Sequence, residues 1–172
     1  LPCTCRRQRQ MCIRDSPHPI NELIQNKIKL AHDQGLSIYL VHGNRDFLLG
    51  SQFEKNTGLK IINDMTIIKD SGISLMIAHG DSFCTDDIEY QALKESLRSE
   101  EWKKDFLQKP IAERITFADG LRAKSAESSS NKAENIMDVN ESYVAEVIER
   151  HKIDFLIHGH THRPAIHKLD NG

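Results

Sequence analysis

The sequence has no long hydrophobic run and no excess of charge of one sign. Its 172 residues include 23 basic and 25 acidic side chains, a formal net charge of −2. That balance offers no overall attraction to nucleic acid. No stretch approaches the roughly 18 to 20 apolar residues needed to cross a bilayer, so the chain is expected at most to lie on a membrane surface. Residues 1–16 lack the apolar centre of a signal peptide, and none is expected there.

Cysteine is scarce and unevenly placed. Three of the four cysteines crowd the first dozen residues, at Cys3, Cys5 and Cys12, and only Cys84 lies elsewhere. This distribution is unlike a disulfide framework and favours a reducing cytoplasm. The early cysteines could hold zinc, but they lack the usual paired two-residue spacing. Cys84 is expected to be a small packed residue.

Hydrophobic residues make up 38% of the chain, which suits a soluble domain with a substantial core. Short apolar runs predict strands at residues 37–41, 60–62, 65–68, 73–78 and 155–157. The residues Asp70-Ser71-Gly72 predict a turn before the fourth of these runs.

Segments whose apolar residues have helical spacing lie between several of these predicted strands. Apolar residues recur at that spacing from Ile20 to Ala31, and Gly35 is placed to end the helix. A loop that continues as a short helix is expected over residues 47–58. A further helix is expected over residues 137–151, capped by Asp138 or Asn140. Strands that alternate with helices predict an α/β protein with a layered sheet and flanking helices.

Polar loops follow three of the predicted strands. They are His42-Gly43-Asn44-Arg45-Asp46, His79-Gly80-Asp81 and His158-Gly159-His160-Thr161-His162. Ligands of layered α/β sheets gather beyond the carboxyl ends of the strands, so all three loops are expected at one edge. On extended backbone His160 and His162 share one side while Thr161 points away, so two imidazoles can converge.

The residue types in these loops indicate metal chemistry. Neutral imidazoles and an amide oxygen suit a first-row divalent ion such as Mn²⁺, Fe²⁺ or Zn²⁺ rather than calcium. Two such ions a few ångströms apart can hold a bridging hydroxide and neutralise a phosphoryl group, as phosphoester hydrolysis requires. The predicted ligands are Asn44, His79, His160 and His162. Capping or packing roles are expected instead for His42, His158 and His167.

Residues 88–135 have a different character, since no strand is evident there. Apolar residues such as Trp102, Phe106 and Leu107 are interleaved with basic ones, which predicts a helical insertion broken at Pro110. One interpretation is a pair of amphipathic helices that pack on the core. The other is a lid whose apolar face holds a lipid substrate and whose basic face contacts anionic headgroups.

The three loops resemble the later motifs of the calcineurin-like metallophosphoesterases. Residues 41–50, 85–87, 136–140 and 158–164 resemble in particular a branch of that family that acts on a nucleotide-linked lipid in lipid A biosynthesis. This likeness runs from about Asp15 to Leu169. It implies metal-dependent hydrolysis of the diphosphate of a UDP-linked, diacylated glucosamine, which gives UMP and 2,3-diacylglucosamine 1-phosphate, with Mn²⁺ as the usual metal.

The resemblance also implies roles for single residues. Asn44, His79 and His160 would ligate the second metal of a pair, and His162 the first. Arg45 is similar to a phosphate clamp, because its planar fork suits a diphosphate oxygen. Arg45 and His160 would thus be the catalytic residues.

The resemblance also implies a location, that of a cytoplasmic protein bound peripherally to the anionic surface of the inner membrane. Substrate contacts are implied in the same way. Ser129 departs from the asparagine expected at its position. The implied substrate-binding residues are Asn44, Arg45, Asp87, Ser125, Ser129, Lys132 and His160.

Two motifs of the family, an Asp-x-His and a Gly-Asp, are absent from this sequence. The chain is therefore expected to be either a fragment with a foreign leader or a degenerate paralogue, and the fragment is favoured. Residues 1–14 would then be a non-native leader, and residues 15–172 a partial metallophosphoesterase domain that carries the insertion. Strands are expected to be missing at both ends, because the hairpin signal Asp170-Asn171-Gly172 has no strand after it. Without a bridging carboxylate the two cations would repel, so the chain by itself is expected to be nearly inactive.

Two alternatives stay open. The first is another calcineurin-like phosphodiesterase or nucleotide hydrolase, whose insertion would lack the apolar stripe seen here. The second is a non-catalytic module that keeps the histidine loops for one structural metal ion.

Overall fold

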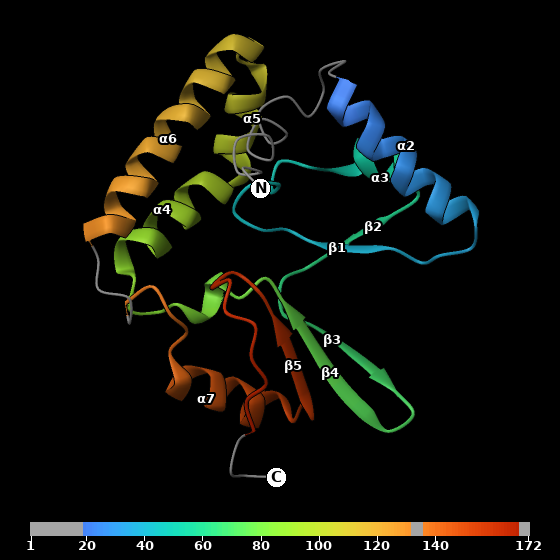
Figure 1. The fold of residues 1–172 in the computed structure, drawn as a ribbon, viewed down its shortest axis with the longest axis vertical. Helices are drawn as coiled ribbons and strands as arrows, with labels where there is room; N and C mark the ends of the chain where they lie inside the picture. Colours follow the sequence, from blue (N-terminus) through green and yellow to red (C-terminus); the bar gives the residue numbers. More distant parts are fainter. Residues whose placement is uncertain (1–18, 132–135, 169–172) are drawn as a thin grey trace. The chain divides into compact units, whose positions relative to one another are not determined.

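The computed structural model describes residues 19–131 and 136–168, which divide into two compact units. One unit comprises Leu1–Ile62 and Ala92–Asn131, and the other comprises Asn63–Gln91 and Lys132–Gly172. The three early cysteines and the predicted leader lie outside the described residues. Helices and strands occur in each unit (Figure 1), which confirms a mixed α/β protein.

The first unit begins with helix α2 (Pro19–Asp33), strand β1 (Tyr39–Val41), helix α3 (Ser51–Thr57) and strand β2 (Lys60–Ile62). All four were predicted, β2 with these ends and the other three with slightly different ends. Strand β1 pairs in parallel with β2, in a register that sets Leu40 beside Ile61. Gly58 ends α3 at a φ of 77°, and its N–H donates to the carbonyl of Glu54. The short connection from α3 to β2 depends on this left-handed glycine.

The insertion contains three helices rather than two: α4 (Ile88–Arg98), α5 (Glu100–Gln108) and α6 (Ile111–Asn131). The predicted break at Pro110 is confirmed. The second break lies at Ser99, whose hydroxyl accepts the Trp102 N–H at 3.2 Å and so caps α5. Serine is a strong N-cap residue, and this local hydrogen bond ends one helix and starts the next.

The apolar stripe of the insertion packs within the first unit. Phe106 and Ala118 are buried in one cluster with Phe47 and Leu48 from the loop after β1. The rings of Trp102 and Phe106 stack with centroids 4.5 Å apart. The packing interpretation is therefore confirmed for these residues, and the lid stays a prediction.

The second unit is built on strands β3 (Thr66–Asp70), β4 (Ile73–Ala78) and β5 (Phe155–His158). Strand β4 lies between an antiparallel β3 and a parallel β5. The predicted turn at Ser71 and Gly72 has φ values of 49° and 83°. Among the described residues the strands form two sheets, β1-β2 and β3-β4-β5, and Met65, at a φ of 59°, lies between β2 and β3.

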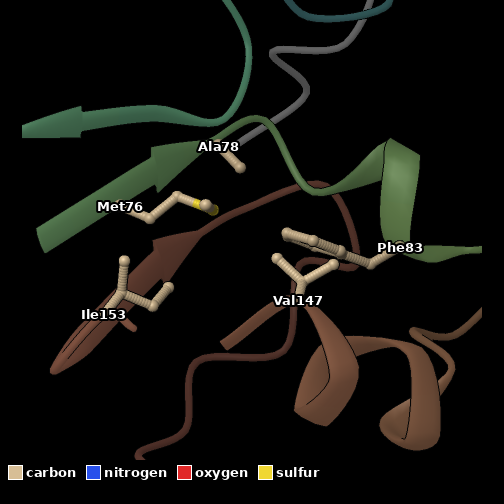
Figure 2. Packing of buried hydrophobic residues seen from close by; sticks show 5 residues of the cluster. All are labelled: Met76, Ala78, Phe83, Val147 and Ile153. Carbon is tan, nitrogen blue, oxygen red and sulfur yellow. The ribbon is translucent and has the colours of Figure 1, made fainter. Parts of the chain in front are cut away.

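Helix α7 (Glu141–His151) covers one face of this sheet. Figure 2 shows Val147 of α7 among Met76, Ala78, Phe83 and Ile153, all of which are buried. Met76 and Ala78 share this face because side chains alternate along a strand.

Helix α7 begins four residues later than predicted. The side chain of Asn140 accepts the N–H of Tyr143 at 3.0 Å, which makes Asn140 the cap. Asp138, the other candidate cap, instead accepts the N–H of Val139 at 2.8 Å. Residues 137–140 therefore form the turn that leads into the helix.

The other face of the sheet carries exposed apolar side chains, since Phe155 is 59% and Ile157 57% exposed. Strand pairing sets Leu75 beside Phe155 and Ile77 beside Ile157, so these residues form one continuous face. Among the described residues, no helix is both long and apolar enough to span a bilayer.

Candidate functional site

Strand pairing in the second unit brings two predicted metal ligands together. Ala78 and His158 are paired at the ends of β4 and β5. The pairing continues by one hydrogen bond beyond the strand ends, because the N–H of Gly159 donates to the carbonyl of His79 at 3.0 Å. The rings of His79 and His160 then meet edge to face, with centroids 5.2 Å apart. Two half-buried imidazoles at this separation are chemically suited to share one divalent ion.

The backbone beyond β5 is not extended, contrary to the prediction. His160 has a φ of 74° and His162 a φ of 58°, both in the left-handed region. The N–H of Thr161 donates to the carbonyl of Gly159 at 3.0 Å, which closes a tight turn centred on His160. The alternation that predicted a shared side for His160 and His162 therefore does not apply, and His162 is exposed.

Left-handed backbone is unfavourable for residues other than glycine, at about 1 to 3 kcal/mol each. Such conformations persist where the surroundings hold them and are concentrated at functional sites. An ion pair between Arg163 and Asp138 ties the end of this loop to the turn before α7.

Gly80 permits the close approach of the two histidine loops. Its φ is 108°, and a Cβ atom there would lie 2.5 Å from the carbonyl oxygen of Gly159. Real Cβ atoms do not approach backbone so closely, so a larger residue would push the loops apart. Glycine in the sequence His79-Gly80-Asp81 is thus required by the geometry.

Asp64 holds the His79 loop in place, a role that sequence reasoning missed. One carboxylate oxygen accepts the His79 N–H at 2.7 Å, and the other accepts the hydroxyl of Ser82 at 2.7 Å. Only its place in a turn between two predicted strands could have drawn attention to it.

A second carboxylate, this one buried, lies near the histidines. Asp81 is fully buried and accepts the Tyr90 hydroxyl at 2.9 Å. The Tyr90 ring lies 5.6 Å from the His160 ring, centroid to centroid. The Gln91 side chain donates to the carbonyls of Asp81 and Cys84, at 2.8 and 2.9 Å. The first turn of α4 is therefore anchored to the histidine loops.

Asp87 has a structural role at the start of α4. It is 9% exposed, and its carboxylate accepts the Tyr90 N–H at 3.1 Å, as an N-terminal cap does. The predicted contact of Asp87 with substrate stays a prediction.

Asn44 and Arg45 are exposed in the loop after β1. This loop is shaped by its own residues, since the Asp46 carboxylate accepts the Gly43 N–H at 2.6 Å. These residues belong to the first unit and His79, His160 and His162 to the second, so their predicted meeting stays a prediction.

The other insertion residues predicted to bind substrate are only partly described. Ser125 is exposed on α6. The side chain of Ser129 and the whole of Lys132 lie outside the described residues. Their substrate contacts therefore also stay predictions.

Packing roles are confirmed for two further histidines and one cysteine. His42 bonds the Leu49 carbonyl at 3.0 Å, and burial lowers the pKa of His42, helped by the nearby cations Lys103 and Arg98. The His158 ring meets Phe83 edge to face at 5.6 Å. Cys84 is 1% exposed and packs beneath the loop.

The donor set fits a divalent ion in part. His79 and His160 supply two nitrogen donors. Within residues 19–131 and 136–168, no three His, Cys, Asp or Glu side chains are grouped closely enough to hold a metal ion.

Comparison with known proteins gives consistent matches. Residues 10–164 match the family described as calcineurin-like phosphoesterases. The chain is 41% identical over 155 residues to the protein named UDP-2,3-diacylglucosamine hydrolase from Escherichia fergusonii and to that from Escherichia coli O7:K1. It is 40% identical to the protein of the same name from Escherichia coli O1:K1. Each match covers 90% of this chain and 65% of the relative, so the chain spans about two thirds of the length of these proteins.

Proposed function

This chain belongs to the calcineurin-like phosphoesterase family, and we propose that the whole protein hydrolyses the diphosphate of UDP-2,3-diacylglucosamine in lipid A biosynthesis. The products would be UMP and 2,3-diacylglucosamine 1-phosphate. The single observation that carries the proposal is the approach of His79 and His160 at the ends of neighbouring parallel strands. The substrate is inferred from the name shared by the similar proteins.

The family's chemistry depends on a divalent metal ion, and we propose Mn²⁺. When bound, such an ion polarises a phosphoryl oxygen and lowers the pKa of a coordinated water. His79 and His160 would be its nitrogen donors, with Asn44 completing that set and His162 serving a second ion. The carboxylate of Asp64 would keep His79 in place through the backbone N–H that it accepts.

Other residues would bind and orient the substrate. Arg45 would hold a diphosphate oxygen through its planar guanidinium, and His160 would face the phosphorus that is attacked. Glucosamine and phosphate contacts are proposed for Asp87, Ser125, Ser129 and Lys132. The exposed apolar side chains of the insertion, such as Leu93 and Phe117, would contact acyl chains, and its basic residues would contact an anionic membrane on the cytoplasmic face.

The test is an assay of the whole protein with Mn²⁺ and UDP-2,3-diacylglucosamine, in which released UMP is measured by chromatography. We expect UMP release from this lipid and much slower release from UDP-N-acetylglucosamine, which lacks the acyl chains. Equal hydrolysis of both, or of a simple phosphodiester such as bis-p-nitrophenyl phosphate, would favour the broader phosphodiesterase alternative. The 172-residue chain, assayed beside it, tests the prediction that it is nearly inactive.

A further inference from the structure

Arg114 is a buried cation that the proposed reaction does not use. It lies in the first turn of α6 and is 5% exposed. Two of its side-chain nitrogens, Nε and Nη1, are buried, and no hydrogen-bond partner for them exists among the described residues. A guanidinium cannot lose its proton in a protein, so the positive charge persists there.

An unpaired buried charge is costly, by several kcal/mol even after the surroundings relax. Two carboxylates of the same unit are engaged elsewhere: Asp46 accepts the Gly43 N–H, and Glu54 accepts the Ile61 N–H at 2.8 Å. Glu113, the chain neighbour of Arg114, is exposed. A bound anion would supply the counter-charge that these two nitrogens of Arg114 lack among the described residues.

The position of Arg114 on α6 favours an anion independently. The first N–H groups of a helix have no partner inside the helix, and this end carries the positive pole of the dipole. The residue before α6 is Pro110, which has no side-chain oxygen to cap those groups. Long side chains on a helix lean toward its N-terminus, so the Arg114 guanidinium is expected to lie near these N–H groups.

The surroundings indicate what kind of anion binds. Ala118, one turn along the same face of α6, belongs to the buried cluster of the first unit. Phe117 contacts Phe106 and Trp102 with ring centroids 5.3 and 5.7 Å away, and is itself 39% exposed. An anionic head beside a partly exposed aromatic cluster matches an amphiphile.

We infer that the N-terminus of α6 and the guanidinium of Arg114 form a binding site for the phosphate group of an amphiphile. The planar fork of Arg114 suits two phosphate oxygens, and the first-turn N–H groups suit a third. The site is independent of the histidine loops and does not rest on the proposed hydrolysis. A free phosphate offers the same oxygens, so the test separates the two sources.

The experiment measures thermal unfolding of the 172-residue chain in phosphate-free buffer, with three probes added in turn. They are inorganic phosphate, n-dodecyl phosphate below its micellar concentration, and n-dodecyl maltoside as a neutral amphiphile. At about a hundred times its dissociation constant, n-dodecyl phosphate is expected to raise the Tm by roughly 5 to 10 °C. An equal rise with inorganic phosphate would identify the anion alone as the ligand, and a rise with the alkyl phosphate only would identify the amphiphile.

Variants assign the effect to Arg114. Arg114→Gln is expected to abolish the rise, whereas Arg122→Gln on the same helix, which removes a partly exposed partner of Asp119, leaves it unchanged. A rise of the same size in Arg114→Gln, or one produced equally by the maltoside, would overturn the inference.

A second measurement tests the premise that Arg114 is unpaired. Without phosphate, Arg114→Met is expected to unfold at the same or a higher temperature than the parent chain, because an apolar side chain of similar size replaces an uncompensated charge. A marked fall in Tm would show that a protein carboxylate already pairs with Arg114, and would contradict the inference.

Discussion

The loop after β1 and the loops after β4 and β5 differ in what fixes their side chains. His79 and His160 follow two strands paired residue by residue, and a backbone hydrogen bond extends that pairing past the strand ends. Asn44 and Arg45 follow a strand of a separate two-stranded sheet and are exposed. The comparison teaches that pairing between neighbouring strands fixes the positions of His79 and His160 relative to each other. A similar motif that follows a strand of another sheet has no such constraint.

The largest effect is expected from the paired histidines. In the whole protein, His79→Ala should lower UMP release and Mn²⁺ affinity by on the order of a hundredfold or more, because it removes one of two convergent donors. His151→Ala, an exposed change on α7 in the same unit, is the matched control and should alter neither. Calorimetric Mn²⁺ titration alongside the assay makes the comparison, and unchanged metal affinity in His79→Ala would remove the residue from the site.

Glycine substitutions probe how closely the two loops approach. Gly80→Ala should lower the free energy of unfolding by about 3 kcal/mol or more, since it adds a backbone clash to the left-handed strain. Gly72→Ala has a similar φ of 83° but nothing within 4 Å of the added Cβ, so only about 1 to 2 kcal/mol should be lost. Urea unfolding of both variants measures the difference. Equal losses would mean that the contact between Gly80 and Gly159 is not rigid.

Substitutions of Asp64 test whether its hydrogen bonds hold the His79 loop in place. Asp64→Ala leaves the His79 N–H and the Ser82 hydroxyl without their acceptor, which should cost about 1 to 3 kcal/mol of stability. Asp64→Asn keeps one acceptor and should lose about half as much. Asp70→Ala, at the exposed last residue of β3, serves as the control and is expected within about 0.5 kcal/mol of the parent. If Asp64→Ala left the free energy of unfolding unchanged, the loop would be held by other contacts.

The smallest effect on stability is expected in the loop after β1. Arg45→Ala should change the free energy of unfolding by less than about 0.5 kcal/mol, because the side chain is exposed. In the whole protein the same change should slow UMP release, as proposed for a phosphate clamp. A stability loss as large as that of Asp64→Ala would show that Arg45 is structural, and the contrast between the two regions would disappear.

Local signals explain why much of the fold could be predicted. Strands β2 and β4 have the predicted ends, because each is a short apolar run beside a strong turn signal such as Gly58 or Ser71-Gly72. The break before α5 was missed because it is marked only by Ser99, whose hydroxyl donates to the Ser96 carbonyl and accepts the Trp102 N–H, and no proline or glycine lies there.

The candidate site was predicted less completely. The types of its residues are visible in the sequence, and so is the approach of His79 and His160, since parallel strands end at one edge. The left-handed backbone at His160 and His162 was not foreseen, because the neighbouring contacts, between Gly80 and Gly159 and between Arg163 and Asp138, join residues distant in the sequence. Asp64 and Tyr90 were missed for the same reason, as their partners are distant in the sequence.

The most direct test of the central claim is paramagnetic broadening of histidine side-chain NMR signals by Mn²⁺, in the 172-residue chain labelled at its imidazole nitrogens. If His79 and His160 hold one ion together, their signals should broaden first and in parallel at substoichiometric Mn²⁺. His151, on α7 in the same unit, should stay sharp at that concentration. Broadening of only one of the pair, or of all histidines alike, would contradict a shared ion.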